Sequence, residues 1–207
     1  MNTPSRPVPS DTLLIGLTGP IGAGKSLVAS VWAQLGAGIV EGDEMGRQAL
    51  IVYAELRRKL AERFGREILD EEGQVIRHKL ADVAFNSPGG AADLTRLTFP
   101  VLNRLAREYF RRLSLDHRVV VYDAALIFEW GIEGDFDRIV VVSAPRDQLI
   151  LRTMTRLGIN RQQAENRLKG QIGIDEKVKK ADIAIVNDGS IEELKVKAEE
   201  VWGVLNS

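Results

Sequence analysis

Short apolar runs alternate with longer amphipathic stretches along this chain. Each apolar run has the length of one strand, and the runs lie at residues 13–18, 38–41, 118–123, 138–143 and 182–187. Short, nearly all-apolar strands that alternate with helices are typical of a parallel sheet covered by helices on both faces. The pattern therefore predicts an α/β protein with a doubly wound, five-stranded parallel sheet.

Two of the helical stretches have recognisable ends. The first is expected to stop at Gly36, because glycine commonly ends helices. Its expected buried residues follow the spacing i, i+3, i+4, i+7, and are Val28, Val31, Trp32 and Leu35. The last helix opens with a capping box formed by Ser190 and Glu193. Its expected buried residues are Ile191, Leu194, Ala198, Val201 and Leu205.

Two long insertions interrupt the alternation of strands and helices. Residues 44–116 form a helical stretch with Arg-rich patches, and residues 146–180 carry five Arg and four Lys against four acidic residues. A locally basic segment suits the binding of a polyanionic ligand. The first residues contain three prolines and no apolar segment, which predicts a flexible tail. The expected division is a tail at 1–12, a core at 13–43, 117–145 and 181–207, and insertions at 44–116 and 146–180.

Composition narrows the classes of protein to which the chain can belong. Its 207 residues are 44% hydrophobic and 28% charged, as in ordinary globular proteins. The absence of Cys excludes disulfides, thiolate zinc sites and cysteine nucleophiles, and it permits a cytoplasmic location. The net charge of −1 gives no overall attraction to nucleic acid or membrane lipid. The longest uncharged run near the N-terminus, residues 26–40, is shorter than the roughly 18 residues of a membrane span.

Residues 19–26 read Gly-Pro-Ile-Gly-Ala-Gly-Lys-Ser and match the phosphate-binding loop pattern G-x-x-x-x-G-K-[ST]. The motif follows a predicted strand and opens a predicted helix, so backbone N–H groups would converge on phosphates. Lys25 would bridge the β- and γ-phosphates of ATP, and the Ser26 hydroxyl would hold Mg²⁺. The fold is therefore expected to be of the P-loop NTPase type. The expected nucleotide-binding residues here are Gly19, Ile21, Gly22, Ala23, Gly24, Lys25, Ser26 and Leu27.

Three further features have a chemical and a structural interpretation. Asp43 follows the second strand at the edge of the sheet where open α/β folds bind ligands, so it is either a general base or the N-cap of the next helix. Arg152 and Arg156 share a helix face, opposite Ile150, Leu151, Met154 and Leu157, and form either a phosphate clamp or a solvated surface. The third strand ends at Asp123, as in Walker B strands that hold Mg²⁺, although many apolar runs end in Asp.

Taken in order along the chain, these residues resemble the dephospho-coenzyme A kinase family from Leu13 to about Trp202. The resemblance rests on the loop at 16–26, Asp43, Arg77, the segment 123–129 and the arginines of 146–180. It implies a P-loop kinase that transfers the γ-phosphate of ATP to the ribose 3′-hydroxyl of dephospho-coenzyme A, the last step of coenzyme A biosynthesis. It further implies that 44–116 binds the acceptor and that 146–180 is a lid.

The same resemblance implies roles for particular side chains. Asp43 would be the catalytic base, with Lys25 and Arg152 stabilising the transferred phosphoryl group. Arg152, Arg156 and Asn187 would bind the nucleotide, and Asp43, Arg77, Phe99 and Leu126 the acceptor. The chain departs from the family pattern at four positions, which are Glu41 for Asp, Leu27 for Thr, Phe99 for His and Ala125 for Pro.

Two other functions fit some of these features. The loop also suits a nucleoside or nucleoside monophosphate kinase, but such kinases usually carry an acidic-Arg-Ser element where this chain has Ala124 and Ala125 after Asp123. A non-catalytic nucleotide-binding module would need neither Asp43 nor the pair of lid arginines. The expected partners are therefore ATP with Mg²⁺ and a small-molecule acceptor, and the sequence leaves the oligomeric state open.

Overall fold

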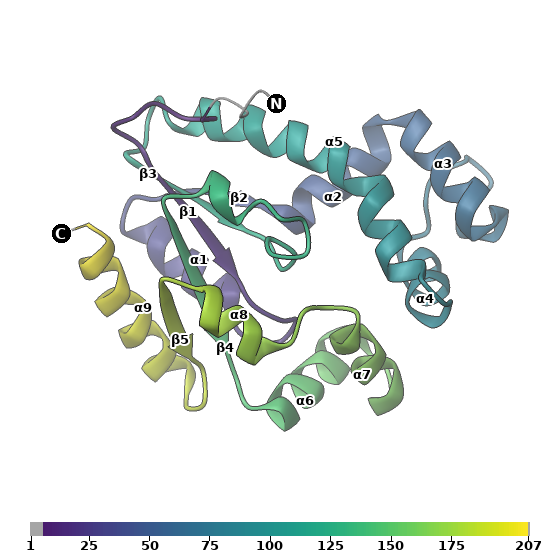
Figure 1. Cartoon of the computed structure of the whole chain (residues 1–207). Helices are drawn as coiled ribbons and strands as arrows, with labels where there is room; N and C mark the ends of the chain where they lie inside the picture. The colour runs from purple at the N-terminus through teal and green to yellow at the C-terminus, as the bar shows by residue number, and fades with distance from the viewer. Residues whose placement is uncertain (1–5, 207) are drawn as a thin grey trace. The chain divides into compact units, whose positions relative to one another are not determined.

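The computed structural model describes residues 6–206 and contains a five-stranded, all-parallel sheet in the order β2-β3-β1-β4-β5 (Figure 1). The strands are β1 (Leu13–Thr18), β2 (Gly38–Glu41), β3 (Val119–Asp123), β4 (Arg138–Ser143) and β5 (Ile183–Val186). All lie within the predicted runs, and the doubly wound α/β fold is confirmed. The polar end residues of two runs lie just outside their strands, and these are Arg118, Asp182 and Asn187.

The chain divides into two compact units. The first comprises Met1–Glu41 and Arg107–Ser207, and the second comprises Gly42–Ala106. The second unit thus begins and ends at other residues than the expected insertion, 44–116, because the last part of one long helix belongs to the first unit. The helices are α1 (Lys25–Gln34), α2 (Gly42–Val52), α3 (Ala54–Phe64), α4 (Arg77–Asn86), α5 (Gly90–Leu113), α6 (Arg146–Leu157), α7 (Arg161–Lys169), α8 (Ile174–Lys180) and α9 (Ile191–Leu205), with 3-10 turns η1 (Arg66–Ile68) and η2 (Glu133–Asp135). Among residues 6–206, none of the helices has the length and apolar character needed to cross a membrane.

Helices α1 and α9 pack side by side over one face of the sheet. Trp32 of α1 is fully buried, and its ring lies 6.1 Å from that of Trp202 on α9. The indole N–H of Trp32 donates a hydrogen bond of 2.8 Å to the carbonyl of Ala198. This bond satisfies the polar atom that burial of a tryptophan would otherwise leave without a partner.

The opposite face of the sheet carries an aromatic cluster. Phe110, near the end of α5, meets Tyr122 of β3 edge to face at 5.3 Å, and Tyr122 stacks on Phe136 at 6.2 Å. Gly16 of β1 lies under this cluster, where an added Cβ would stand 2.6 Å from the Cδ1 atom of Ile139. Because both faces of the sheet are covered, the strands are apolar throughout, and each strand could therefore be predicted from an apolar run in the sequence.

Two predicted core positions are wrong. Leu35 is 44% exposed because α1 ends at Gln34, so that Leu35 is the capping residue after the last turn. Ile191 is 61% exposed because it is the first residue of α9, directly after the Ser190 cap. The other predicted positions of these two helices are buried or partly buried. The capping box of Ser190 and Glu193 is present.

The predicted flexible tail is anchored over its second half. Residues 1–5 lie outside the described residues, but Val8 is buried and Arg6 forms two hydrogen bonds, of 2.7 and 2.8 Å, with the carboxylate of Asp137. Asp137 also accepts the N–H of Leu14 at 2.8 Å, and Arg6 donates to the carbonyl of Thr12. The segment 6–12 is therefore fixed to the first strand by a carboxylate beside β4.

The second unit has its own small core. Helices α3 and α4 pack against each other and against η1, and their inward residues follow helical spacing. The buried side chains are Leu56, Leu60, Phe64, Ile68, Leu80 and Ala84. This core explains how a stretch with so many arginines folds into a compact body.

Candidate active site

The phosphate-binding loop joins β1 to α1 and requires glycine at its start. Gly19 has φ +143°, and a Cβ there would collide with the carbonyl oxygen of Val142 on β4. Gly24, with φ +103°, is the left-handed residue before α1, and no acidic residue occupies the first turn of that helix. The positive end of the α1 dipole is therefore left for an anionic ligand.

Side chains behind the loop fix the direction of its peptide groups. Asn187 donates from Nδ2 to the carbonyl of Ala23 at 2.8 Å, and the Thr153 hydroxyl lies 3.5 Å from the carbonyl of Ile21. In a trans peptide the carbonyl and the following N–H point in opposite directions. The N–H groups of Gly22 and Gly24 consequently face away from these braces, toward the open side of the loop.

Lys25 and Ser26 lie in the first turn of α1. The Lys25 ammonium is 3.3 Å from the carbonyl of Pro20, at the start of the loop, and the Ser26 side chain is exposed. Leu27, which stands where the resembled family has Thr, packs against the core of the first unit. The loop therefore presents one ammonium and one hydroxyl beside its row of N–H groups.

Helix α6 lies directly against the loop. A Cβ on Gly22 would be 3.1 Å from the carbonyl oxygen of Leu149 and 3.3 Å from the Cβ of Arg152. Arg152 donates to Gln148 at 2.8 Å and lies 3.4 Å from the carbonyl of Asn187, whereas Arg156, one turn later, is exposed. The structure thus brings Arg152, Asn187 and the loop together.

The buried face of α6 differs from the predicted one. Its buried residues are Leu149, Ile150 and Thr153, whereas Leu151 is 63% and Leu157 37% exposed. Thr153 was not predicted as a site residue. Thr153 lies on the buried face, with its hydroxyl 3.5 Å from the carbonyl of Ile21 in the phosphate-binding loop. The buried polar residue breaks the apolar spacing on which the prediction rested.

Two carboxylates line the carboxyl edge of the sheet in the first unit. Asp123, the last residue of β3, is in register with Leu17 on one side and with Glu41, the last residue of β2, on the other. Asp123 is partly buried and Glu41 is exposed. Leu17 is followed by Thr18 and the phosphate-binding loop, so Asp123 lies at the base of that loop.

The remaining predicted site residues are placed as follows. Leu126, in the turn after β3, belongs to the first unit and is partly buried. Asp43, Arg77 and Phe99 belong to the second unit, where Asp43 is in the first turn of α2, Arg77 begins α4 and Phe99 lies within α5. Asp43 and Arg77 are exposed, and Phe99 is partly buried. Their contacts with an acceptor remain predictions.

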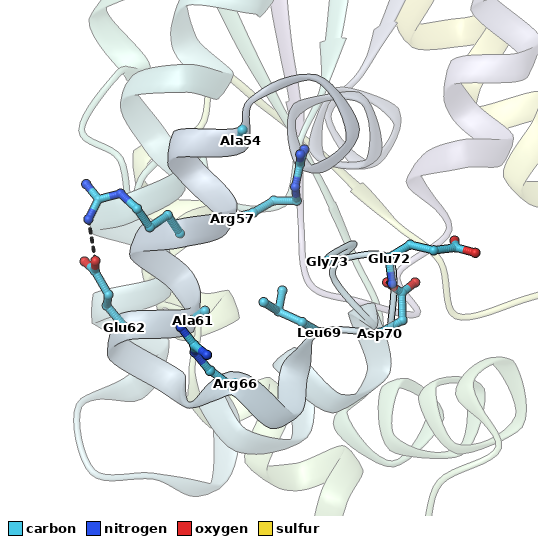
Figure 2. Close-up of a pocket in the computed structure, with 10 residues that line it drawn as sticks. Ala54, Arg57, Ala61, Glu62, Arg66, Leu69, Asp70, Glu72 and Gly73 are labelled. Carbon is cyan, nitrogen blue, oxygen red and sulfur yellow. Dashed lines mark hydrogen bonds and ion pairs between the residues drawn. The ribbon is translucent and has the colours of Figure 1, made fainter.

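Figure 2 shows a pocket of about 770 Å³ in the second unit, between α3 and the segment that follows it. Three arginines line it beside three acidic residues, so it has no net charge. Arg57 donates to the carbonyls of Leu50 and Ile51 at the end of α2, and Arg58 pairs with Glu55 and Glu62. These arginines therefore stabilise helices of the unit. The pocket is lined by Ala54, Arg57, Arg58, Ala61, Glu62, Arg66, Leu69, Asp70, Glu72 and Gly73.

Comparisons with known proteins agree with this geometry. The family model of dephospho-CoA kinase matches residues 13–193. A dephospho-CoA kinase of Syntrophotalea carbinolica is 40% identical over 184 residues, which are 88% of this chain and 87% of that protein. One of Aquifex aeolicus is 37% identical over 192 residues, 91% of this chain and 95% of that protein.

Solved structures show the same fold. A crystal structure of a Thermus thermophilus protein, TT1252, aligns with a TM-score of 0.74 and 30% identity, and covers 94% of this chain and 98% of that one. A Campylobacter jejuni dephospho-CoA kinase aligns with a TM-score of 0.59 and 23% identity, over 95% and 98% of the two chains. The family model spans all five strands and both insertions, and the chain therefore belongs to the dephospho-CoA kinase family.

Proposed function

We propose that this protein transfers the γ-phosphoryl group of ATP to the ribose 3′-hydroxyl of dephospho-CoA. The observation that carries the proposal is the braced phosphate-binding loop, with Arg152 beside it, in a chain of the dephospho-CoA kinase family. This loop binds the phosphates of ATP through backbone N–H groups, Lys25 and Ser26. The reaction yields ADP and 3′-phosphorylated dephospho-CoA, which is coenzyme A.

In the proposed mechanism, Asp43 accepts the proton of the 3′-hydroxyl as its oxygen attacks the γ-phosphorus. The bond between that phosphorus and the oxygen bridging to the β-phosphate breaks, and the electron pair leaves with ADP. Lys25, Arg152 and the loop N–H groups stabilise the negative charge on the transferred group. Asp43 follows the last residue of β2 by two positions, which supports a role at this edge of the sheet.

The residues present fit a Mg²⁺ ion. Magnesium is usually held by one or two protein oxygens together with substrate phosphates and water. The exposed hydroxyl of Ser26 and the carboxylate of Asp123, at the base of the same loop, are oxygen donors of this kind. When bound, the ion would neutralise charge on the β- and γ-phosphates.

Arg77, Phe99 and Leu126 are proposed to bind dephospho-CoA, and Arg77 offers the clearest test. The substrate carries a pyrophosphate, which a guanidinium group binds through paired hydrogen bonds. Arg77→Ala is expected to raise the KM for dephospho-CoA more than the KM for ATP, with the fold intact because Arg77 is exposed. Steady-state kinetics with each substrate varied in turn measure the two constants. An equal rise in both, or a rise for ATP alone, would remove Arg77 from the acceptor site.

The proposed lid, residues 146–180, offers a second test. Its two ends are anchored, because α6 packs on the phosphate-binding loop and Lys177 of α8 is buried. Because the Ile172 N–H is also held, by Glu129 at 2.8 Å, motion is expected between these ends, over α7 and its flanking turns, residues 158–171. Amide exchange should be fast there without ligand, and ATP should slow it. Equal protection with and without ATP would contradict a lid.

ADP release with a panel of acceptors tests the proposed function as a whole. Dephospho-CoA should support ADP release, whereas nucleosides, nucleoside monophosphates and shikimate should not. Release with a nucleoside or a nucleoside monophosphate instead would identify the alternative kinase class. Binding of ATP with no release for any acceptor would identify a nucleotide-binding module.

We also propose a cytoplasmic location, where ATP and reduced thiol substrates are available.

A further inference from the structure

Lys177 is a fully buried cation outside the residues discussed so far. Its ammonium donates to the carbonyl of Ala125 at 2.7 Å and to the carboxylate of Glu129, with distances of 2.8 Å to Oε1 and 3.1 Å to Oε2. Burial lowers the pKa of Lys177, and the hydrogen bond and charge of Glu129 oppose that effect. Burying a charge is unfavourable unless it is paired, so a buried Lys177 is expected to serve a purpose that its pairing with Glu129 makes possible.

The carboxylate of Glu129 and the carbonyl of Ala125 also form hydrogen bonds to Ile172 and to Thr18. Oε1 of Glu129 accepts the N–H of Ile172, at the end of the proposed lid, at 2.8 Å. The carbonyl of Ala125 lies 3.2 Å from the hydroxyl of Thr18, the last residue of β1 before the phosphate-binding loop. Three segments therefore meet at these four polar groups and Lys177. We call this arrangement the junction, formed by Thr18, Ala125, Glu129, Ile172 and Lys177.

We infer that Glu129 and Lys177 are positioning residues, which fix the turn after β3 and the exit of the lid relative to the phosphate-binding loop. The inference rests on the proposed function, because that function gives the turn and the lid their roles. Neither side chain is placed to touch a substrate, since Lys177 is fully buried and Glu129 is 12% exposed. Both oxygens of Glu129 already accept hydrogen bonds, so Glu129 acts within the junction, whereas Asp123 and Ser26 are the residues that would hold a Mg²⁺ ion.

The junction joins segments that the chain separates widely. Glu129 and Lys177 are 48 residues apart, and Ala125 is 107 residues from Thr18. Contacts between residues so far apart in the sequence fix three segments relative to one another, in addition to stabilising any one helix or turn. A displacement of about 1 Å between reacting groups can lower turnover roughly 100-fold, so a loosened junction should reduce kcat.

The test removes both charges together. A single substitution would leave an unpaired buried charge, whereas replacing both partners by apolar residues of similar volume is often neutral for stability. Glu129→Met/Lys177→Met is therefore expected to fold, with a circular dichroism spectrum and unfolding midpoint near those of the wild type. Its kcat should fall on the order of 10- to 100-fold, while the KM values for ATP and dephospho-CoA change far less. Exchange of the Ile172 amide should become roughly tenfold faster or more.

Lys179→Met is the matched control. It makes the same change on the same helix, but Lys179 is exposed and lies outside the junction. Its kcat and its Ile172 exchange rate should stay near the wild-type values. An equal loss in this control would mean that the effect comes from the charge of α8, and it would overturn the inference.

A folded double variant with wild-type kcat, or with unchanged Ile172 exchange, would also overturn it. If the double variant fails to fold, Glu129→Asp provides the test, because it keeps the charge opposite Lys177 but shortens the reach to Ile172. Faster Ile172 exchange with a lower kcat is then expected, and wild-type values of both would overturn the inference. Failure of the proposed function is distinguishable, because a wild-type protein inactive on dephospho-CoA would still report the junction through Ile172 exchange.

Discussion

Asp43→Asn is expected to lower kcat about 10²- to 10⁴-fold, with little change in the KM for ATP. Asparagine has the shape of aspartate but cannot accept the proton of the 3′-hydroxyl. Asp43 is exposed in the first turn of α2, so the substitution should leave the fold intact. Steady-state kinetics with saturating dephospho-CoA and varied ATP measure both constants.

Glu41→Gln is the control for this prediction. Glu41 ends β2, lies in register with Asp123, and precedes the proposed base by two residues in the sequence. It is expected to assist, and its loss should lower kcat by a smaller factor than Asp43→Asn. If Glu41→Gln proves the more damaging substitution, Glu41 is the base and the proposed roles are reversed.

Lys25→Ala is expected to lower kcat roughly 100-fold or more, because it removes a preorganised positive charge from the transferred phosphoryl group. The fold should be kept, since α1 is anchored by the buried residues Val28, Ala29, Val31 and Trp32. Turnover and circular dichroism of the same preparation check both expectations. Lys195→Ala, on the exposed side of α9, removes an equal charge away from the loop and should have little effect. Wild-type turnover in folded Lys25→Ala would exclude Lys25 from the mechanism.

The strands were predictable because both faces of the sheet are buried. Each strand is an apolar run, and its ends in the structure differ from the predicted ends by one residue at most. Three polar residues of the predicted runs lie outside the strands, which are Arg118 before β3 and Asp182 and Asn187 on either side of β5. Asn187, for example, turns its side chain to the carbonyl of Ala23, far away in sequence.

Helix faces were less predictable, because apolar spacing identifies a stripe but not what covers it. Leu151 of α6 fits the stripe and is exposed, whereas Thr153 does not fit it and is fully buried against the phosphate-binding loop. Lys177 gave a signal that could have been used. It follows Ile174 by three residues and precedes Val178, so a cation occupies the apolar side of a short helix. Such a position predicts a buried partner, but the sequence alone does not identify Glu129.

The roles of the arginines in 44–116 also depend on tertiary contacts. Arg57 and Arg58 belong to a basic patch in the sequence, yet they hold helix carbonyls and glutamates of the same unit. Arg104 lies over the ring of Tyr53 at 5.0 Å, and Arg107 pairs with Asp135 at 3.1 Å. The basic patches in the sequence thus indicated a helical unit rich in arginine. In the structure, these four arginines contact carbonyls, carboxylates or an aromatic ring of the protein itself.

The position of the new phosphate on the product decides whether this protein phosphorylates the 3′-hydroxyl of dephospho-CoA. The protein is incubated with ATP, Mg²⁺ and dephospho-CoA, and the product is analysed by phosphorus NMR, with a parallel reaction containing nucleosides. We expect a new monoester on the ribose 3′-oxygen of dephospho-CoA and no phosphorylated nucleoside. A nucleoside phosphorylated at its 5′-oxygen, with dephospho-CoA unreacted at millimolar concentration, would contradict it.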